Sequence, residues 1–500
     1  MLRRRQTEWP RVAIVGAGMS GILMGIKLHK RGIPFTIYEK ASSVGGTWRE
    51  NTYPGLICDV PSQYYRYSFE PNPDWSLQFS PGSEICRYLE KTAHRRAVYP
   101  HIRFGCEIVS IKLNEDCWVL RTQTREQFTA DVVITAVGFL HHPFVPPLKG
   151  LNDFQGVAFH SAHWDHNINI RGKCVGIVGN GSTGVQLVGE ITPHVGKLKL
   201  FQRTAQWIFP AVNGPFSEKT KKLFRLCPLL ANVSYWRVRR SFLGTFGKAL
   251  EGDPKWKAWL DGLCQQNLDT VKDPKLRAKL TPTYKPACKR IVLSGQFYQA
   301  IQMPHAEVIV EAIDHVAPKG IVTRDGKLHE VDILVLATGY KAHDFISSIE
   351  IIGMQGRDLK QLWANGPTAY QTVAIPGLPN FFSVIGPYSP VNNTSIISCA
   401  ETQVAYIMRC IDTILRGRIS MTPKVEQADR QIAEWRKAAM NTIWGSGCKS
   451  WYQDKEGVPL IYPYSPQQFE DDLSHAPILE HYDLRTIART RPLSTQPTAT

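Results

Sequence analysis

The chain has 500 residues, of which 43% are hydrophobic and 20% are charged. This composition excludes a disordered, collagen-like or coiled-coil protein, and the length predicts roughly two to four domains. Lys and Arg number 59 against 43 Asp and Glu, a formal net charge of +16, so nucleic acid, an anionic membrane and an anionic ligand are the partners to weigh first.

Cysteine usage and the absence of recognisable targeting patterns favour the cytoplasm. The 11 Cys residues are scattered without a CxxC pair, so neither a disulfide scaffold nor a zinc site is predicted, and the dispersed His residues predict no other metal site. The opening Met-Leu-Arg-Arg-Arg leads into a polar segment rather than the apolar core of a signal peptide. Residues 12–26 are apolar but are broken by four Gly and too short to span a bilayer, so no integral membrane segment is expected.

Residues 12–38 predict a first strand–helix–strand unit with a G-x-G-x-x-G turn between strand and helix. Gly16 permits the tight turn, Gly18 lets a pyrophosphate approach the backbone, and Gly21 lets helix and strand pack closely. Glu39 ends the second strand, where a carboxylate accepts the ribose hydroxyls of a dinucleotide. The unit therefore predicts a dinucleotide site, with a fortuitous Gly turn as the alternative.

Residues 175–202 repeat this pattern with a different ending. The turn carries Gly179, Gly181 and Gly184, but the second strand leads into Arg203 and no acid follows it. An Arg pairs with the 2′-phosphate that a carboxylate would repel, so this site is predicted to bind NADP rather than NAD. The alternative is that Arg203 is a solvated residue at a strand end. The candidate NADP residues are Gly179, Gly181, Ser182, Thr183, Gly184, Arg203 and Thr204.

Two nucleotide sites on one chain indicate a tightly held redox cofactor and an exchangeable hydride donor, assigned as FAD at the first site and NADPH at the second. The predicted fold class is α/β, with two doubly wound Rossmann-like dinucleotide-binding domains and a helical insertion in the second. The predicted strands lie at residues 12–15, 35–38, 132–135, 175–178, 198–202 and 333–336. The predicted parts are 1–145 and 376–484 for the FAD domain, 146–375 for the NADP domain with the insertion at 211–285, and 485–500 for a disordered tail.

Beyond the glycines, several segments resemble the Baeyer–Villiger monooxygenases, and the resemblance extends from about residue 12 to about residue 463. The linker fingerprint of that family is matched by Phe154, Gly156, His160, Trp164 and Asp165. Further matches are Gly45-Gly-Thr-Trp48, Tyr53-Pro-Gly55, Cys58-Asp59, Cys288-Lys289-Arg290, Ala337-Thr-Gly339, Gly386-Pro-Tyr-Ser-Pro390 and Gly447-Cys-Lys-Ser-Trp-Tyr452.

The resemblance implies a reaction in which NADPH reduces FAD and O₂ adds to give a C4a-peroxyflavin, which attacks a ketone carbonyl to yield an ester or lactone. It also implies that Arg290 stabilises the anionic peroxide, that Asp59 orients Arg290, and that Lys289 contacts the 2′-phosphate with Arg203. His160 and Trp164 are expected to hold the linker rather than to do acid–base chemistry. The candidate FAD residues are Gly16, Gly18, Met19, Ser20, Gly21, Glu39, Lys40, Gly46, Thr47, Trp48, Asp59 and Tyr65.

Two other functions stay open at this point. One is a flavin-containing monooxygenase that oxygenates an amine nitrogen or a sulfide sulfur; that group usually has Tyr or Phe where this chain has Trp164. The other is a flavoprotein that senses NADPH without oxygenating anything, which would not need Asp59 and Arg290. Ala287 stands where a Gly often precedes the Cys-Lys-Arg run, which leaves the subgroup and the substrate undetermined.

The excess of positive charge is concentrated in the predicted insertion. Residues 215–280 carry 14 Lys and Arg against 6 Asp and Glu. No recognition motif accompanies this charge, so nucleic acid is not an expected partner. A peripheral contact between the insertion and an anionic membrane is one interpretation, and a solvated helix face is the other. The sequence makes no prediction of oligomeric state.

Overall fold

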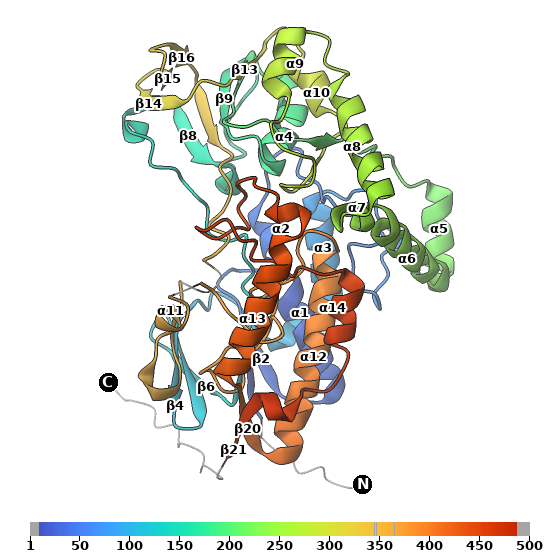
Figure 1. The fold of residues 1–500 in the computed structure, drawn as a ribbon, viewed down its shortest axis with the longest axis vertical. Helices are drawn as coiled ribbons and strands as arrows, with labels where there is room; N and C mark the ends of the chain where they lie inside the picture. The colour runs from blue at the N-terminus through green and yellow to red at the C-terminus, as the bar shows by residue number, and fades with distance from the viewer. Residues whose placement is uncertain (1–9, 345, 347, 365, 488–500) are drawn as a thin grey trace.

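Two parallel sheets organise the structure, a computed structural model that describes residues 10–344, 346, 348–364 and 366–487. Each sheet has five strands, in the orders β19-β7-β1-β2-β3 and β13-β10-β9-β17-β8. The first sheet and its helices form the lower half of Figure 1 and the second sheet forms the upper half. The predicted α/β class with two dinucleotide-binding folds is confirmed.

The first sheet is built on the unit that the sequence predicts. Its strands are β1 (Val12–Val15), β2 (Phe35–Tyr38), β3 (Ile102–Arg103), β7 (Val132–Thr135) and β19 (Phe381–Ser383), and all pairings between them are parallel. α1 (Met19–Arg31) connects β1 to β2 and packs against α12 (Ile396–Gly417). β1 and β7 are buried along their whole length, which is why their sequences are unbroken apolar runs.

The second sheet repeats this construction. Its strands are β8 (Val157–His160), β9 (Cys174–Val178), β10 (Lys197–Phe201), β13 (Ala306–Ile309) and β17 (Ile333–Leu336), again all parallel. α4 (Ser182–Ile191) connects β9 to β10 and packs against α10 (Phe297–Ile301). β8 pairs with β17, so the middle of the linker fingerprint, Val157–His160, is an edge strand of this sheet rather than a free connection.

Four smaller sheets in the described residues were not anticipated from the sequence. They comprise β4 (Ile108–Asn114), β5 (Cys117–Thr122), β6 (Gln127–Ala130) and β18 (Glu350–Ile352); β14 (Ile313–Ala317), β15 (Gly320–Thr323) and β16 (Leu328–Glu330); β11 (Ile208–Phe209) with β12 (Val292–Leu293); and β20 (Ile419–Pro423) with β21 (Tyr482–Thr486). Because β18 pairs with β4, the chain has returned to the first half by Glu350, earlier than the predicted boundary at 376. Arg485 and Thr486 pair in β21 and so are not disordered, whereas residues 488–500 of the predicted tail lie outside the described residues.

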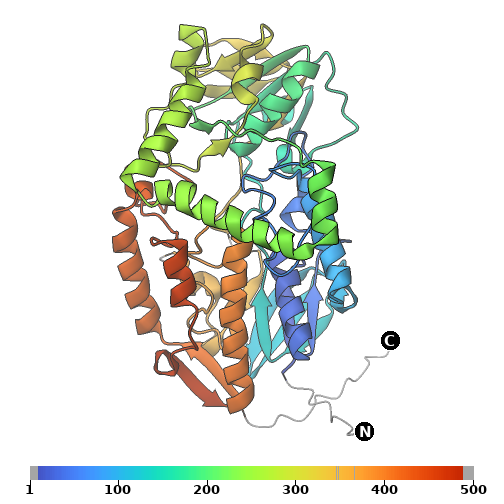
Figure 2. The ribbon, with the colours of Figure 1, turned by 90° about the vertical axis from the view of Figure 1, so that its right-hand side faces the viewer.

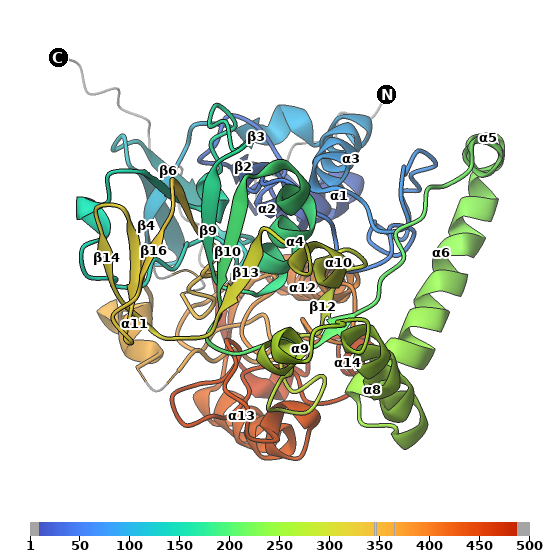
Figure 3. The same cartoon turned by 90° about the horizontal axis from the view of Figure 1, so that it is seen from above.

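The predicted insertion is helical and lies along both halves. Its helices are α5 (Glu218–Leu226), α6 (Pro228–Phe242), the π-helical turn η5 (Leu243–Gly247), α7 (Lys248–Leu250), α8 (Pro254–Leu268) and α9 (Pro274–Leu280). Ser217 caps α5 through the Thr220 amide, and Asp253 caps α8 through the amides of its first turn. In Figure 2 α6 crosses the side of the molecule that faces the viewer, and in Figure 3 it lies at the outer edge.

The remaining elements are helices and turns outside the insertion. They are α2 (Thr47–Glu50), α3 (Gly82–Arg95), α11 (Leu359–Leu362), α13 (Val425–Met440), α14 (Pro466–Asp472) and the 3₁₀ turns at 99–101, 151–153, 161–163, 192–194, 354–356, 443–445 and 479–481. Of the helices in the described ranges, none combines the length and the apolar character needed to cross a bilayer.

Candidate functional site

A cavity of about 970 Å³ lies where the two glycine turns face each other. One side is formed by the first turn, with Gly16 and Gly18, and by the loop that carries Trp48 and Asp59. The other side carries residues 181–183 of the second turn, together with Arg290. The volume is in the range of cofactor and substrate sites, and the structure thus brings candidates from both predicted sites to one space.

The first glycine turn has the shape that a bound pyrophosphate requires. Gly16 has φ +102°, and a Cβ there would lie 2.7 Å from the Ala136 carbonyl oxygen. A Cβ on Gly21 would lie 1.9 Å from the Gly16 carbonyl oxygen, so α1 can approach β1 only with Gly at this position. No side chain caps α1, which leaves its first amides for an anion, and Met19 and Ser20 line the cavity beside them.

Glu39 lies at the end of β2 with its side chain buried. One carboxylate oxygen accepts the Ala17 amide at 2.7 Å and the other accepts the Ala41 amide at 3.0 Å. These bonds hold the carboxylate at the cavity wall and leave lone pairs for ribose hydroxyls. Lys40, which follows Glu39, contacts the His141 ring nitrogen through Nζ at 2.6 Å.

The loop after β2 supplies an aromatic wall. Trp48 Nε1 donates to the Tyr65 hydroxyl at 3.1 Å, and the two rings meet edge to face. Gly46 and Thr47, just before Trp48, also line the cavity. Burial raises the pKa of Tyr65 well above its usual value, so its hydroxyl stays protonated at neutral pH. The five candidates on this loop, Asp59 included, therefore lie together.

Arg290 and Asp59 form an ion pair at the bottom of the cavity. Arg290 Nε donates to Asp59 Oδ2 at 2.8 Å, and Nη2 lies 2.6 Å from the same oxygen. Nη1 donates to the Val391 carbonyl at 3.0 Å, so the guanidinium is held on two sides. Burial acts to lower the pKa of Arg290, but the Asp59 carboxylate outweighs it and the net pKa is raised, so the guanidinium is permanently charged.

The second glycine turn repeats the close contacts of the first. Gly179 has φ +106°, and a Cβ there would lie 2.4 Å from the Ala337 carbonyl oxygen; a Cβ on Gly184 would lie 2.1 Å from the Gly179 carbonyl oxygen. Gly181, by contrast, has open space where a Cβ would stand. Gly181, Ser182 and Thr183 line the cavity. The turn is tied to the first half by Tyr53, whose hydroxyl donates to Gln186 Oε1 on α4 at 2.9 Å.

The end of β10 gathers two cations without an acid. Arg203 is exposed and Lys289 is half-buried. Burial lowers the pKa of Lys289, and the charge of Arg203 lowers it further, so the two side chains lie close enough to repel. Among the described residues neither forms a salt bridge, and Lys289 Nζ instead lies 4.5 Å from the centroid of the Tyr284 ring. Thr204 follows Arg203, and its carbonyl accepts Asn180 Nδ2 at 2.9 Å.

The linker fingerprint folds against the second sheet. His160, buried at the end of β8, accepts the Ala162 amide on Nδ1 at 3.1 Å and donates from Nε2 to the Gly339 carbonyl at 3.1 Å. These partners require the neutral Nε2–H tautomer, and burial lowers the pKa of His160. Trp164 packs edge to face on Phe159. The cavity wall includes Ala162 and His163 but not His160 itself.

The other fingerprint positions are local supports. Gly156 is required because a Cβ there would lie 2.4 Å from the Asp332 carbonyl oxygen and 2.5 Å from the Phe154 ring. Asp165 accepts the Asn167 amide at 2.9 Å in an exposed turn. The fingerprint therefore shapes the connection between the halves and contributes neighbours of His160, rather than His160 itself, to the cavity.

A smaller pocket beside Arg290 contains residues that sequence reasoning missed. Its wall is mainly apolar, and both polar atoms of the Asn392 amide are buried there without a hydrogen-bond partner in the described chain. The apolar lining residues are Val60, Phe242, Phe246, Leu250, Ala287, Ile291, Leu293 and Trp444. The sequence signal for Asn392 was its position two residues after Pro390, the end of a matched segment.

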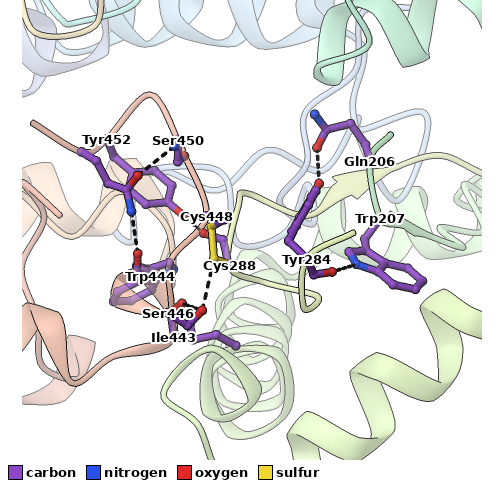
Figure 4. The surroundings of a disulfide bond; sticks show 11 residues. Gln206, Trp207, Tyr284, Cys288, Ile443, Trp444, Ser446, Cys448, Ser450 and Tyr452 are labelled. Atoms are coloured by element: carbon purple, nitrogen blue, oxygen red, sulfur yellow. Dashed lines mark hydrogen bonds between the residues drawn. A yellow bond between two sulfur atoms is a disulfide. The ribbon is translucent and has the colours of Figure 1, made fainter. Parts of the chain in front are cut away.

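One disulfide bond is present, although the scattered Cys residues predicted no disulfide scaffold. Cys288 and Cys448 are bonded, with their Cα atoms 6.1 Å apart and 160 positions apart in sequence. Figure 4 shows the bond beside Tyr452, whose hydroxyl donates to the Cys288 carbonyl, and Ser446, whose hydroxyl lies 3.2 Å from Cys288 Sγ. Such a separation leaves no spacing pattern to detect, and only the fold brings the two residues together.

Known proteins resemble this chain along nearly its whole length. Residues 10–232 match the family model described as flavin-binding monooxygenase-like. A Baeyer–Villiger monooxygenase of Streptomyces coelicolor is 35% identical over 96% of this chain and 93% of its own length. An uncharacterized monooxygenase of Mycobacterium tuberculosis is 45% identical over 97% of this chain and 98% of its own.

A solved structure agrees with these relatives. The crystal structure of cyclohexanone monooxygenase from Rhodococcus sp. Phi1 bound to NADP⁺ superposes with a TM-score of 0.84 at 28% identity, covering 96% of this chain and 99% of that one. The similarity therefore includes both sheets, the helical insertion and the C-terminal helices, not the glycine turns alone.

Proposed function

The chain belongs to the Baeyer–Villiger monooxygenases, and on that premise we propose that it uses NADPH and O₂ to convert a ketone into an ester or lactone at the Arg290–Asp59 pair. It is a flavoprotein monooxygenase, as its relatives are. The observation that carries the proposal is the position of this ion pair in one cavity with both glycine turns.

The first glycine turn, Glu39 and the aromatic loop fit FAD. The turn excludes a Cβ where a pyrophosphate approaches, and the held Glu39 carboxylate faces the place of a ribose. When bound, the flavin accepts hydride from the nicotinamide and activates O₂. The protein positions it: Gly46, Thr47 and the Trp48–Tyr65 pair form the wall against which the ring system would lie.

Arg290 provides the electrostatic part of the chemistry. Its permanent charge stabilises negative charge on the oxygen being transferred and on the ketone oxygen as the carbonyl carbon is attacked. Asp59 and the Val391 carbonyl hold the guanidinium, which leaves Nη1 and Nη2 hydrogens to direct at those oxygens. The apolar wall of the neighbouring pocket, which encloses about 20 Å³, keeps water from that side of Arg290. The carbon skeleton of the substrate would lie in the cavity of about 970 Å³.

The second turn and the two cations fit NADPH. Arg203 and Lys289 meet without a neutralising carboxylate, an arrangement that a 2′-phosphate would stabilise. His160 acts as a positioning residue, because its bond to Gly339 fixes the linker against the Ala337-Thr-Gly339 segment. Thr204 and the α4 amides complete the contacts expected of this nucleotide.

An assay of Arg290→Ala against Arg290→Lys tests the proposal. The wild-type protein, loaded with FAD, should convert members of a ketone panel to esters or lactones with consumption of NADPH. Arg290→Ala should lose about 10²- to 10³-fold in product formation while its flavin is still reduced by NADPH. Arg290→Lys keeps a charge but loses the fixed fork, and should recover only part of the activity.

The same assay separates the alternative functions. Sulfoxide from thioanisole or an N-oxide, with no ester or lactone from any ketone, would identify a flavin-containing monooxygenase of the heteroatom type. NADPH oxidation that gives only hydrogen peroxide would identify a non-oxygenating flavoprotein. Ester formation by Arg290→Ala at the wild-type rate would remove the assigned role of Arg290.

The cellular compartment and the partners of the enzyme are also proposals. We place it in the cytoplasm, where NADPH is regenerated, with O₂ and a small organic substrate as partners and without nucleic acid. Fractionation of cells that express the chain at natural level checks the compartment: recovery with an extracytoplasmic marker would contradict it.

A further inference from the structure

The outer surface of α5 and α6 carries an unusual number of exposed apolar side chains. Leu226 is 75% exposed, Leu229 68% and Trp236 54%. With their exposed neighbours they form what we call the α5–α6 apolar face, which consists of Leu223, Leu226, Leu229, Leu230, Val233 and Trp236. Figure 3 shows these two helices at the edge of the molecule, away from both sheets.

The α5–α6 apolar face is not used to hold the insertion in place. The opposite side of α6 anchors it, because Ala231 and Tyr235 are buried there and Val238 and Phe242 pack against the same core. Arg66 fixes this inner side by donating to the Ala231 carbonyl at 2.9 Å. α6 therefore has two apolar sides. The outer one is exposed, and the ring contacts of its Trp236 are to Tyr235 and Arg239 of the same helix.

The outer residues of α6 form one stripe. Leu229, Val233 and Trp236 are separated by four and three positions, which places them on one side of the helix, and Arg240 follows four positions later on the same side. The inner residues have the same spacing two positions later, so the two stripes lie on opposite sides of α6.

Positive charge surrounds the α5–α6 apolar face. Residues 218–242 contain seven Lys and Arg and one acid, Glu218. Arg225 pairs with Asp74 at 2.6 Å, Lys221 with Glu218 at 2.9 Å and Arg239 with Glu470. The other four cations are exposed and form no salt bridge within the described residues: Lys219, Lys222, Arg237 and Arg240.

We propose that the α5–α6 apolar face docks on the surface of an anionic lipid bilayer. The Leu and Trp side chains would enter the boundary between headgroups and acyl chains, and the four unpaired cations would contact lipid phosphates. A second copy of the chain fits this surface less well, because a symmetric contact would bring the same cations of both copies together. A nucleic acid would match the cations but leave the apolar stripe unused.

The position of α6 gives this docking a consequence for substrate supply. Its last residue, Phe242, lines the small pocket beside Arg290, thirteen residues or about 20 Å from Leu229. An apolar substrate dissolved in the bilayer would thus be held within a short distance of the pocket. The docking itself does not depend on the proposed oxygenation.

Flotation of the full-length, FAD-loaded protein with vesicles tests the proposal. The vesicles are phosphatidylcholine alone, or with roughly a third phosphatidylglycerol, at about 20 mM and about 500 mM salt. We expect the wild type to float with the anionic vesicles at low salt and at least tenfold less with the neutral ones. Leu226→Ser/Leu229→Ser/Trp236→Ser should reduce flotation at least tenfold, and Lys219→Glu/Lys222→Glu/Arg237→Glu/Arg240→Glu should abolish it on anionic vesicles.

A matched control variant carries the same kind of change elsewhere. Val425 and Met440, on α13, are 50% and 47% exposed, and Val425→Ser/Met440→Ser should float like the wild type. Retained flavin and unchanged NADPH oxidation in solution show that a variant is folded. Failure of the wild type to float at low salt, or equal loss in the α13 control, would overturn the proposal. So would light scattering that shows a dimer which Trp236→Ser dissociates.

Discussion

The two halves of the molecule share a glycine turn with the same close contacts and differ in the side chains just after the second strand of each unit. In each, a glycine six residues after the strand meets the turn backbone so closely that no Cβ fits: 1.9 Å at Gly21 and 2.1 Å at Gly184. The first residue after β2 is Glu39, which is buried and accepts two amides, whereas the second residue after β10 is Arg203, which is exposed and lies near Lys289. We infer that the backbone contacts of the turns suit a dinucleotide in both halves, and that the side chains just after the second strand select which one.

The largest expected effect comes from adding a Cβ at the closely packed glycine of each half, in two separate variants. Gly21→Ala should yield protein without flavin, because α1 can no longer approach β1. Gly184→Ala should keep its flavin but lose reduction by NADPH. Flavin absorbance after purification and stopped-flow reduction measure the two losses.

Gly262→Ala provides the control for this pair. Gly262 lies in α8 with no atom near the place of a Cβ, so Ala should leave flavin content and reduction unchanged and raise stability slightly. If NADPH reduces the flavin of Gly184→Ala at the normal rate, the second turn does not hold the nucleotide.

A smaller effect is expected at the two cations of the second half. Arg203→Ala and Lys289→Ala should each raise KM for NADPH about 10- to 100-fold, because a charged hydrogen bond to the 2′-phosphate is lost, and should leave KM for NADH unchanged. Steady-state kinetics with both nucleotides check this. Equal kcat/KM for NADH and NADPH in the wild type would refute the 2′-phosphate assignment.

The lowered pKa of Lys289 predicts that the KM for NADPH depends on pH. A Lys is charged below its pKa, so this side chain loses its charge at a lower pH than an ordinary Lys, and KM for NADPH should rise as the pH becomes alkaline. In Lys289→Arg the charge persists and the rise should flatten. An identical alkaline profile in both proteins would mean that Lys289 does not contact the nucleotide.

The smallest effect is expected in the smaller pocket beside Arg290. Asn392→Leu removes a buried amide that lacks partners, and should stabilise the protein by about 1 kcal/mol as measured by thermal unfolding. It should also shift preference, by a few-fold in kcat/KM, from hydroxylated ketones toward plain aliphatic ones. An unchanged ratio would show that substrates do not reach Asn392.

The sequence predicts the two parallel sheets well because their strands are short apolar runs next to glycines with a steric function. β1, β2, β7 and β17 match the predicted residues. The smaller sheets escaped prediction, since a half-exposed strand such as β6 has a mixed pattern that a loop can also have.

Site residues could be predicted where the residue type itself indicates a chemical role. They could not be predicted where a residue belongs to the site only because the fold places it there. Arg290 and Asp59 could be named because an ion pair of this kind matches a family segment, although they are 231 positions apart. Asn392 and Phe242 carry no such signal, and they become pocket residues only through the packing of α6 and of the segment after Pro390. The Cys288–Cys448 bond was likewise not predictable, because only the fold brings the two residues together.

That bond gives the protein a topology that its linear sequence does not suggest. It closes residues 288–448 into a covalent ring with two tails, and the ring contains the return of the chain from the second half to the first. A protease that cuts once inside the ring opens it without dividing the molecule, whereas a cut in either tail releases a fragment at once. On a gel, the first product migrates as one species until a reductant is added and as two afterwards. Cys448→Ser removes this distinction.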